Sequence, residues 1–164
     1  LYNTKITDAG LAHLAGLGNL CSLNLGGTKI TDDGIGHLGG LMQLEELDLT
    51  STRVTCSMLA HLQGTTSLRR IQFDRTYELT DEHLAQLSHL RNLDELSCVS
   101  DFVTDNGLKQ LGNLKQLRQL QIGGEQITNA GVAAFDSPFG KSSSRGDSSA
   151  TSLRSSSSGA LNTS

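Results

Sequence analysis

The sequence predicts an α/β solenoid, a right-handed superhelix of stacked repeats with a parallel sheet on its concave face and short helices on its convex face. Three observations predict this fold. A unit of constant length recurs along most of the chain, each unit combines the spacing of a strand with that of a helix, and a threonine stands at the same place in every unit. A fixed period of this kind indicates repeats that stack on one another.

Leucines set the period. The first unit is truncated and covers residues 1–19, and the later units begin at Leu20, Leu44, Leu68, Leu93 and Leu117. Their spacing is constant except for one additional residue in the fourth unit. The stretch LCSLNLGGTKITDDGIGHLGGLMQ shows the pattern, which is L-x-x-L-x-L-x-x-T-x-I-T-D-x-G-L-x-x-L-x-x-L-x-x. Seven positions of each unit are expected to be apolar.

Each unit combines two periodicities, that of a strand and that of a helix. Leu23 and Leu25 have the alternate spacing of a short strand with one buried face. Ile35, Leu38 and Leu41 are three residues apart, as on one face of a short helix. Neither apolar face can be buried within a single unit, so each unit must stack on its neighbours.

A column of threonines marks the expected helix starts. It occurs in all six units, as Thr7, Thr31, Thr55, Thr80, Thr104 and Thr128. Its hydroxyl can accept a hydrogen bond from a backbone N–H of the first helical turn. Aspartate follows in four units, as Asp8, Asp32, Asp81 and Asp105. A negative charge there suits the positive end of a helix, so we interpret these acids as part of the cap and not as catalytic groups.

A second threonine column lies three residues earlier. It consists of Thr4, Thr28, Thr52 and Thr76 and is continued by Asp101 and Glu125. At the bend that leaves the strand, a small polar side chain can satisfy backbone groups that the turn removes from the sheet.

The pattern L-x-x-L-x-L-x-x-T-x-I resembles the leucine-rich repeat consensus, with threonine at the usual asparagine or cysteine position. The longer form, as in TKITDAGLAHLAGLGNL, is similar to bacterial repeats ending in I-T-D-x-G-L and to the cysteine-containing repeats of ubiquitin-ligase receptors. The resemblance covers roughly residues 1–136 and implies a protein-binding scaffold. The chain departs from the family in lacking recognisable caps at either end, and it starts within a repeat, so we expect it to be a fragment.

Some units depart from the pattern. The additional residue of the fourth unit is expected to bulge near Tyr77 or Glu78. The third unit has Cys56-Ser57-Met58 in place of Asp-x-Gly and Thr65 in place of a leucine, so its helix is expected to be the least well packed. Cys98 occupies a core strand position and is expected to be an inert, buried thiol.

The periodicity stops at about Asp136. Residues 1–136 are therefore predicted to form the repeat domain, and the serine-rich residues 137–164 to form a disordered tail. The tail contains the integrin-ligand tripeptide at residues 145–147, arginines followed by serine, and a glycosylation-type sequence at residues 162–164. Each is a short motif of low specificity.

Composition excludes several classes of function. A net charge of −4, with no basic run and no long apolar stretch, argues against a nucleic-acid or membrane partner. Three scattered cysteines argue against a disulfide framework or a zinc site, which slightly favours a cytoplasmic protein, although the location of the full protein stays unknown. No nucleophile elbow or P-loop is present, so we expect no enzyme, cofactor or small-molecule substrate.

Three histidines also stand in one column, as His13, His37 and His61. A metal would need their nitrogens within about 2.0–2.1 Å of one ion, whereas packed helices lie roughly 8–10 Å apart. We therefore interpret this column as an exposed polar stripe.

Function is expected on the outward positions of the strands. They show charges that alternate in sign from strand to strand, and the predicted partner-binding residues are Glu45, Glu46, Asp48, Arg69, Arg70, Gln72, Asp74, Asp94, Glu95, Arg118 and Gln121. One interpretation is a ladder of cross-strand ion pairs that neutralises the sheet. The other is a stripe that selects a polar partner with complementary charges.

The leading hypothesis is a non-catalytic module that binds a protein of unknown identity on its sheet. Two alternatives stay open. The chain can be the substrate-recognition part of a ubiquitin ligase, although no F-box-like helical segment is present, or a regulatory repeat region of a larger enzyme.

Overall fold

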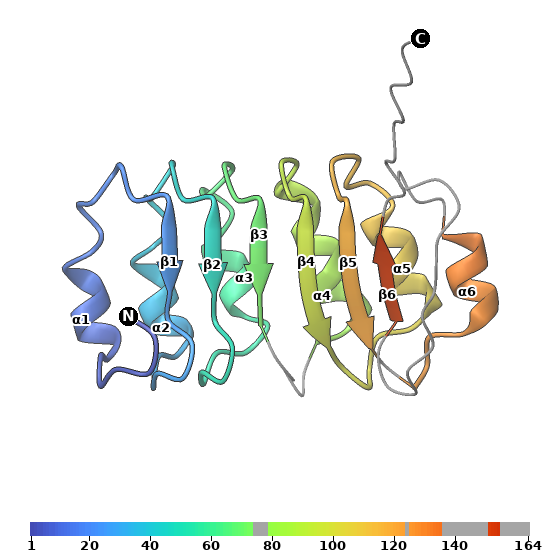
Figure 1. Cartoon of the computed structure of the whole chain (residues 1–164), viewed down its shortest axis with the longest axis horizontal. Helices are drawn as coiled ribbons and strands as arrows, with labels where there is room; N and C mark the ends of the chain where they lie inside the picture. Colours follow the sequence, from blue (N-terminus) through green and yellow to red (C-terminus); the bar gives the residue numbers. More distant parts are fainter. Residues whose placement is uncertain (74–78, 124, 136–150, 155–164) are drawn as a thin grey trace, which may run out of the picture.

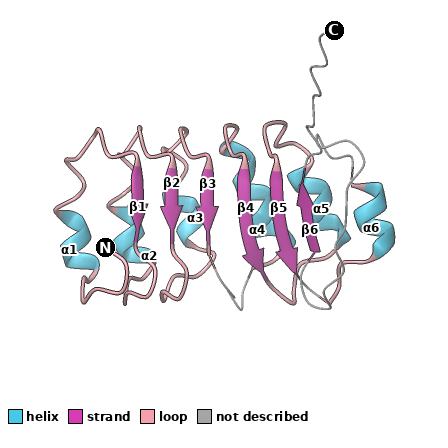
Figure 2. Cartoon of the chain, viewed as in Figure 1, coloured by secondary structure: helices cyan, strands magenta, loops and turns pink. Residues whose placement is uncertain are grey.

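The computed structural model describes residues 1–73, 79–123, 125–135 and 151–154. Within them, one sheet runs along the molecule, and its strands follow one another in sequence order. Figure 1 shows the strands side by side with the helices behind them, and Figure 2 shows the same two layers by element type. The strands are β1 (Ser22–Asn24), β2 (Glu46–Asp48), β3 (Arg70–Gln72), β4 (Glu95–Val99), β5 (Gln119–Gly123) and β6 (Thr151–Arg154).

Strands β1 to β5 are parallel, and their register follows the repeat. Leu23 pairs with Leu47 and Leu47 with Ile71, so that equivalent positions of successive units stand opposite each other. Ile71 pairs with Leu96, and the register is kept although the fourth unit is one residue longer. The predicted fold class is therefore confirmed, and the chain is an α/β leucine-rich repeat solenoid.

Short helices form the second layer. They are α1 (Asp8–Ala12), α2 (Asp32–Gly36), α3 (Met58–His61), α4 (Asp81–Gln86), a 3₁₀ turn η1 (Leu87–His89), α5 (Asp105–Leu111) and α6 (Asn129–Ala134). Helices α2 to α5 each lie between consecutive parallel strands, as a parallel sheet requires. The space between the layers is filled by columns of leucine and isoleucine.

The strand column of this core shows how completely it is buried. Its members, Leu23, Leu47, Ile71, Leu96 and Leu120, are at most 6% exposed. Burial of one such side chain contributes roughly 1.5–3 kcal/mol, so stacking of the repeats is driven mainly by this layer. Thr65 is also buried, at the place that Leu41 has in the preceding unit, and its hydroxyl donates to the carbonyl of Leu62 at 2.7 Å.

The bend after the strand position uses a left-handed residue in the first three units. Asn3, Gly27 and Ser51 have φ of 53°, 69° and 55°. The threonine that follows each of them donates its hydroxyl to the carbonyl three residues earlier, as Thr28 does to Leu25 at 2.6 Å. The predicted role of this column is confirmed for Thr4, Thr28 and Thr52, whereas Thr76 lies outside the described residues.

The aspartate column joins neighbouring units, which the sequence did not predict. Asp81 accepts from the backbone N–H of Thr104 at 2.9 Å and from its hydroxyl at 2.6 Å. The same pair of bonds runs from Thr31 to Asp8, from Thr55 to Asp32 and from Thr128 to Asp105. We call each pair an Asp–Thr clamp.

The expected capping role of the first threonine column is confirmed for Thr104 and Thr128 and not for Thr7 and Thr31. Thr7 and Thr31 precede α1 and α2 without a side-chain capping bond. Thr104 and Thr128 do accept from the first turn of their helices, from the N–H of Asn106 and of Gly131. The hydroxyl proton is directed to the preceding unit in every clamp, because a carboxylate is a stronger acceptor than a neutral group.

A glycine column leaves room for the clamp. A Cβ atom at Gly34, Gly107 or Gly131 would lie 2.3, 2.4 or 1.9 Å from an oxygen of the preceding unit's aspartate. In the third unit Met58 occupies this place, and α3 begins only there, so its helix has four residues. Its expected poor packing is not apparent in burial, because Cys56 and Met58 are at most 1% exposed.

The last strand does not belong to the repeats. β6 pairs antiparallel with β5, with Leu153 opposite Leu120, and covers the edge that β5 would otherwise present (Figure 1). For these four residues the structure differs from the expected disordered tail, because an extended segment can satisfy the open backbone groups of an edge strand. The expected boundary at residue 136 and the expected bulge at Tyr77 or Glu78 lie outside the described residues.

Candidate partner-binding face

The solvent side of strands β1 to β5, here called the sheet face, carries the predicted site. Alternation along each strand directs one residue inward and the next outward, so that Leu47 is buried while Glu46 and Asp48 remain partly exposed. Because the strands are in register, equivalent residues form three polar columns across the sheet.

The first column precedes the strands and contains an ionic ladder. Arg69 lies between two acids, with Nε 3.6 Å from Oε2 of Glu45 and Nη1 3.6 Å from Oδ2 of Asp94. Arg118, the next member, has no ion pair with any described residue. The predicted cross-strand ladder is therefore confirmed from Glu45 to Asp94, and Arg118 is left available.

In the second column, side-chain contacts join β1, β2 and β3. The Ser22 hydroxyl donates to Oε2 of Glu46 at 3.1 Å, and Nη2 of Arg70 contacts Oε1 of the same carboxylate. Glu95 stands opposite Arg70 in register but forms no ion pair with a described residue. Exposed pairs of this kind contribute about 0.2–1 kcal/mol each, so they favour particular side-chain positions and add little to the stability of the fold.

The third column centres on Asp48. Asn24 donates Nδ2 to Oδ2 of Asp48 at 2.8 Å, while Thr50 donates its N–H and its hydroxyl to Oδ1 at 2.9 and 2.7 Å. Farther along, the Ser97 hydroxyl donates to Oε1 of Gln121 at 3.4 Å. Gln72 lies between these groups, and its amide has no hydrogen-bond partner among the described residues.

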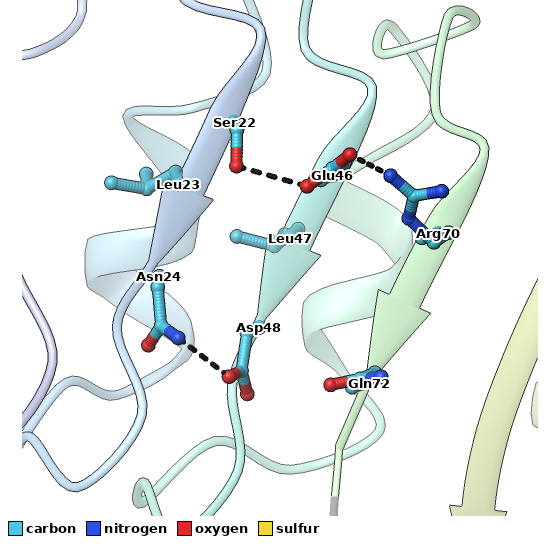
Figure 3. A pocket seen from close by; sticks show the side chains of 8 residues that line it. All are labelled: Ser22, Leu23, Asn24, Glu46, Leu47, Asp48, Arg70 and Gln72. Carbon is cyan, nitrogen blue, oxygen red and sulfur yellow. Dashed lines mark hydrogen bonds and ion pairs between the residues drawn. The ribbon is translucent and has the colours of Figure 1, made fainter.

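A shallow depression of about 170 Å³ lies between β1 and β3. We call it the polar hollow. Figure 3 shows its carboxylates and amides turned to the same side of the strands. Its lining consists of Ser22, Leu23, Asn24, Glu46, Leu47, Asp48, Arg70 and Gln72.

The structure brings most of the predicted residues onto one face. Those on β2, β3 and β4 or directly before them are contiguous, and Arg118 and Gln121 continue the columns at β5. Asp74 lies outside the described residues. Ser22, Asn24 and Thr50 were expected on this outward surface from their place in the repeat, but they were not among the predicted partner-binding residues. The structure shows that they bond to the acids of the site.

Other candidate chemistry falls on core or exposed positions. Cys98 is buried, and burial, together with the charge of Cys56, raises the pKa of its thiol to about 12, so the predicted buried thiol is confirmed. His13, His37 and His61 are exposed at the ends of α1 to α3. Across the described ranges, no three histidine, cysteine, aspartate or glutamate side chains gather as metal ligands. None of the described helices is long and apolar enough to cross a membrane.

Comparisons with protein-family models and with curated proteins find no match. Solved structures do match. An internalin from Listeria monocytogenes is 22% identical over 76% of this chain and 53% of its own, with a TM-score of 0.43. This chain therefore spans about half the length of that protein. Internalin C2 from the same organism is 22% identical over 84% and 75%, with a TM-score of 0.49.

A third similar structure is the leucine-rich repeat ectodomain of the plant membrane receptor kinase GASSHO1/SCHENGEN3 from Arabidopsis thaliana, solved in complex with CASPARIAN STRIP INTEGRITY FACTOR 2. It is 21% identical over 71% of this chain and 14% of its own, with a TM-score of 0.48. These neighbours are leucine-rich repeat proteins. The fold assignment itself rests on the repeat register and the parallel sheet.

Proposed function

We propose that the chain is a non-catalytic interaction module that holds a protein partner on its sheet face. The observation that carries this proposal is the polar surface of β1 to β5, where charged side chains are fixed by cross-strand bonds above a buried leucine layer. Side chains that are already positioned lose little conformational entropy on binding, which favours specific recognition.

The shape of this face favours a macromolecule over a small ligand. Small-molecule sites are usually concave pockets of about 300–1,000 Å³ lined mostly by apolar groups. The polar hollow holds only about 170 Å³ and is lined largely by carboxylates, amides and an arginine. A protein that spreads over several strands can use such a surface, since electrostatic complementarity then sets partner choice and association rate.

Charge reversal tests the proposal. The double variant Arg69→Glu with Arg70→Glu would place like charges on three adjacent strands and remove every ion pair found between described residues. We expect recovery of a partner that the wild-type chain captures to fall about tenfold, which corresponds to ~1.4 kcal/mol. Quantitative affinity capture at low and high salt measures this.

A matched control distinguishes an effect of charges on the sheet face from an effect of the net charge of the chain. Lys5→Glu with Lys29→Glu changes the charge by the same amount in the exposed loops that lead into α1 and α2. Capture should then match that of the wild type. If neither partner recovery nor melting temperature changed in the Arg69 and Arg70 variant, both the binding role and the stabilising role of the ladder would be contradicted.

A further inference from the structure

The polar hollow has an excess of negative charge. Its lining includes two carboxylates, Glu46 and Asp48, and a single cation, Arg70. Arg70 contacts Glu46 and not Asp48. The hollow therefore carries a net charge of −1, which is concentrated at its Asp48 side.

Asp48 is held by neutral donors alone. Asn24 and Thr50 supply three hydrogen bonds to it, and no ion pair with a described residue compensates its charge. The side chain is half-buried, so its negative potential is less screened than that of a fully exposed acid.

Gln72 provides a further polar group beside it. The residue is exposed and stands opposite Asp48 in the parallel pairing of β2 with β3. Its side-chain carbonyl can accept from an incoming donor at no loss of an existing bond, because its amide is unpaired among the described residues.

We infer that the polar hollow seats a cationic side chain, lysine or arginine, of the bound protein, with its charge against Asp48 and a donor directed to Gln72. This inference rests on the proposed function, since it names the chemistry of the partner at the same face. The partner's cation would supply the counter-charge that Asp48 lacks among the described residues. Glu46 already contacts Arg70, so the cation would have to compete with Arg70 for it.

A bare metal ion does not fit the hollow as well as an organic cation does. A calcium ion takes about six to eight oxygen ligands at 2.3–2.6 Å, whereas the oxygens of Asp48 already accept three hydrogen bonds. A guanidinium or ammonium group needs only one or two of the remaining lone pairs.

The experiment uses two probes that differ in charge but hardly in shape. N-acetyl-arginine methylamide and N-acetyl-citrulline methylamide are titrated at low salt into the full chain labelled with ¹⁵N. The arginine probe should shift the amide signals of Asn24, Leu47 and Gln72, including the side-chain amides, and the citrulline probe should not. N-acetyl-lysine methylamide should act like the arginine probe. Equal shifts from citrulline and arginine, or no shift from either, would overturn the inference.

Two variants locate the effect. Asp48→Asn should weaken the arginine probe about two- to fivefold, as expected for loss of a partly exposed ion pair. Glu45→Gln changes the charge equally but lies outside the hollow, and it should leave the affinity unchanged. Equal weakening by both variants would assign the effect to net charge and contradict the inference. Should Asp48→Asn lose the dispersed amide spectrum of the folded chain, Gln72→Leu removes the second acceptor of the hollow and leaves the bonds of Asp48 intact. It should weaken the arginine probe, and an unchanged affinity would contradict the inference.

The outcomes separate this inference from the proposed function. If Arg69→Glu with Arg70→Glu abolishes partner capture while the arginine and citrulline probes behave alike, the sheet face binds a partner but the hollow does not seat its cation. If the arginine probe binds selectively while capture is insensitive to charge reversal, the hollow accepts cations but the sheet face is not the partner site.

Discussion

The junction between the third and fourth units differs from the other junctions of the solenoid. Four junctions carry an Asp–Thr clamp, which ties the start of one helix to the aspartate of the unit before it. At the third-to-fourth junction Cys56 replaces the aspartate, and Thr80 instead contacts Nδ1 of His83 in its own helix at 3.0 Å. The sheet still continues through this junction, since β3 pairs with β4.

This difference teaches that the repeats are joined by two separable systems. The buried leucine layer and the parallel backbone pairing operate at every junction between β1 and β5. The clamp is added to them, and where the clamp is missing His83 occupies the place that Gly107 has in the next unit. The unclamped junction is therefore expected to open first.

Removal of a clamp should have the largest effect. Asp81→Ala deletes two hydrogen bonds to a half-buried carboxylate and leaves the N–H of Thr104 without its acceptor. We expect a loss of about 1.5–3 kcal/mol in the free energy of unfolding, measured by urea denaturation. Glu82→Ala, at the exposed neighbouring position, should change stability by less than about 0.5 kcal/mol. Equal effects of the two variants would show that the clamp does not stabilise the junction.

A side chain placed in the space next to the clamp should lower the free energy of unfolding slightly less than removal of the clamp does. In Gly107→Ala the new Cβ would lie 2.4 Å from Oδ1 of Asp81 and 2.9 Å from Cδ1 of Leu84. We expect a loss of about 1–3 kcal/mol, because overpacking forces the clamp or the helix to move. Gly40→Ala, which meets nothing within 4 Å, is the control for thermal denaturation and should be neutral or slightly stabilising. A neutral Gly107→Ala would contradict the close approach.

A double-mutant cycle can install the missing clamp. Cys56→Asp alone should destabilise the chain, since His83 stands at a glycine position in a helix that already begins at Asp81. Met58 accommodates the clamp of Asp32 at the same position only in a helix that begins three residues after Thr55. Addition of His83→Gly should recover stability, with a coupling of about 1 kcal/mol. Unfolding free energies of the two single variants and the double variant give this number. Additive effects would mean that the glycine column is independent of the clamp.

The smallest expected effect is a pH dependence at the last clamp. The N–H and the hydroxyl of Thr128 donate to Asp105 and hold the pKa of that carboxyl below its usual value of 3.8. Because the folded pKa is the lower one, this clamp contributes its full stability above the usual pKa and loses it as the pH falls through the lowered value. Amide exchange of Thr128 in acid, compared with Asp105→Asn, measures the loss. Identical pH profiles in the two proteins would contradict it.

The sequence predicts the fold well because the signals for it are repeated. The leucine period determines the register of β1 to β5, and alternating signs at Glu45, Arg69 and Asp94 predict the ladder that forms. The clamp was not predicted because its partners lie in different units and each has a sufficient local explanation as part of a helix cap. β6 was not predicted because a serine-rich segment has few apolar residues, and its pairing depends on the backbone edge of β5.

The sequence predicts which residues of the site share one face of the sheet, but not which of their side chains bond to each other. Position within the repeat places Asp48 and Gln72 on the sheet face. The structure adds that Asp48 is held by Asn24 and Thr50, which leaves it without a cation among the described residues. Such detail depends on side-chain conformations, which periodicity does not determine.

The central claim, that the sheet face holds the partner, is tested most directly by hydrogen exchange of the chain with and without a captured partner. We predict slower exchange in residues 44–50, 68–73 and 93–98, which span β2, β3 and most of β4, and unchanged exchange in α2, α4 and α5. Protection confined to the helices, with the strands unchanged, would contradict the claim.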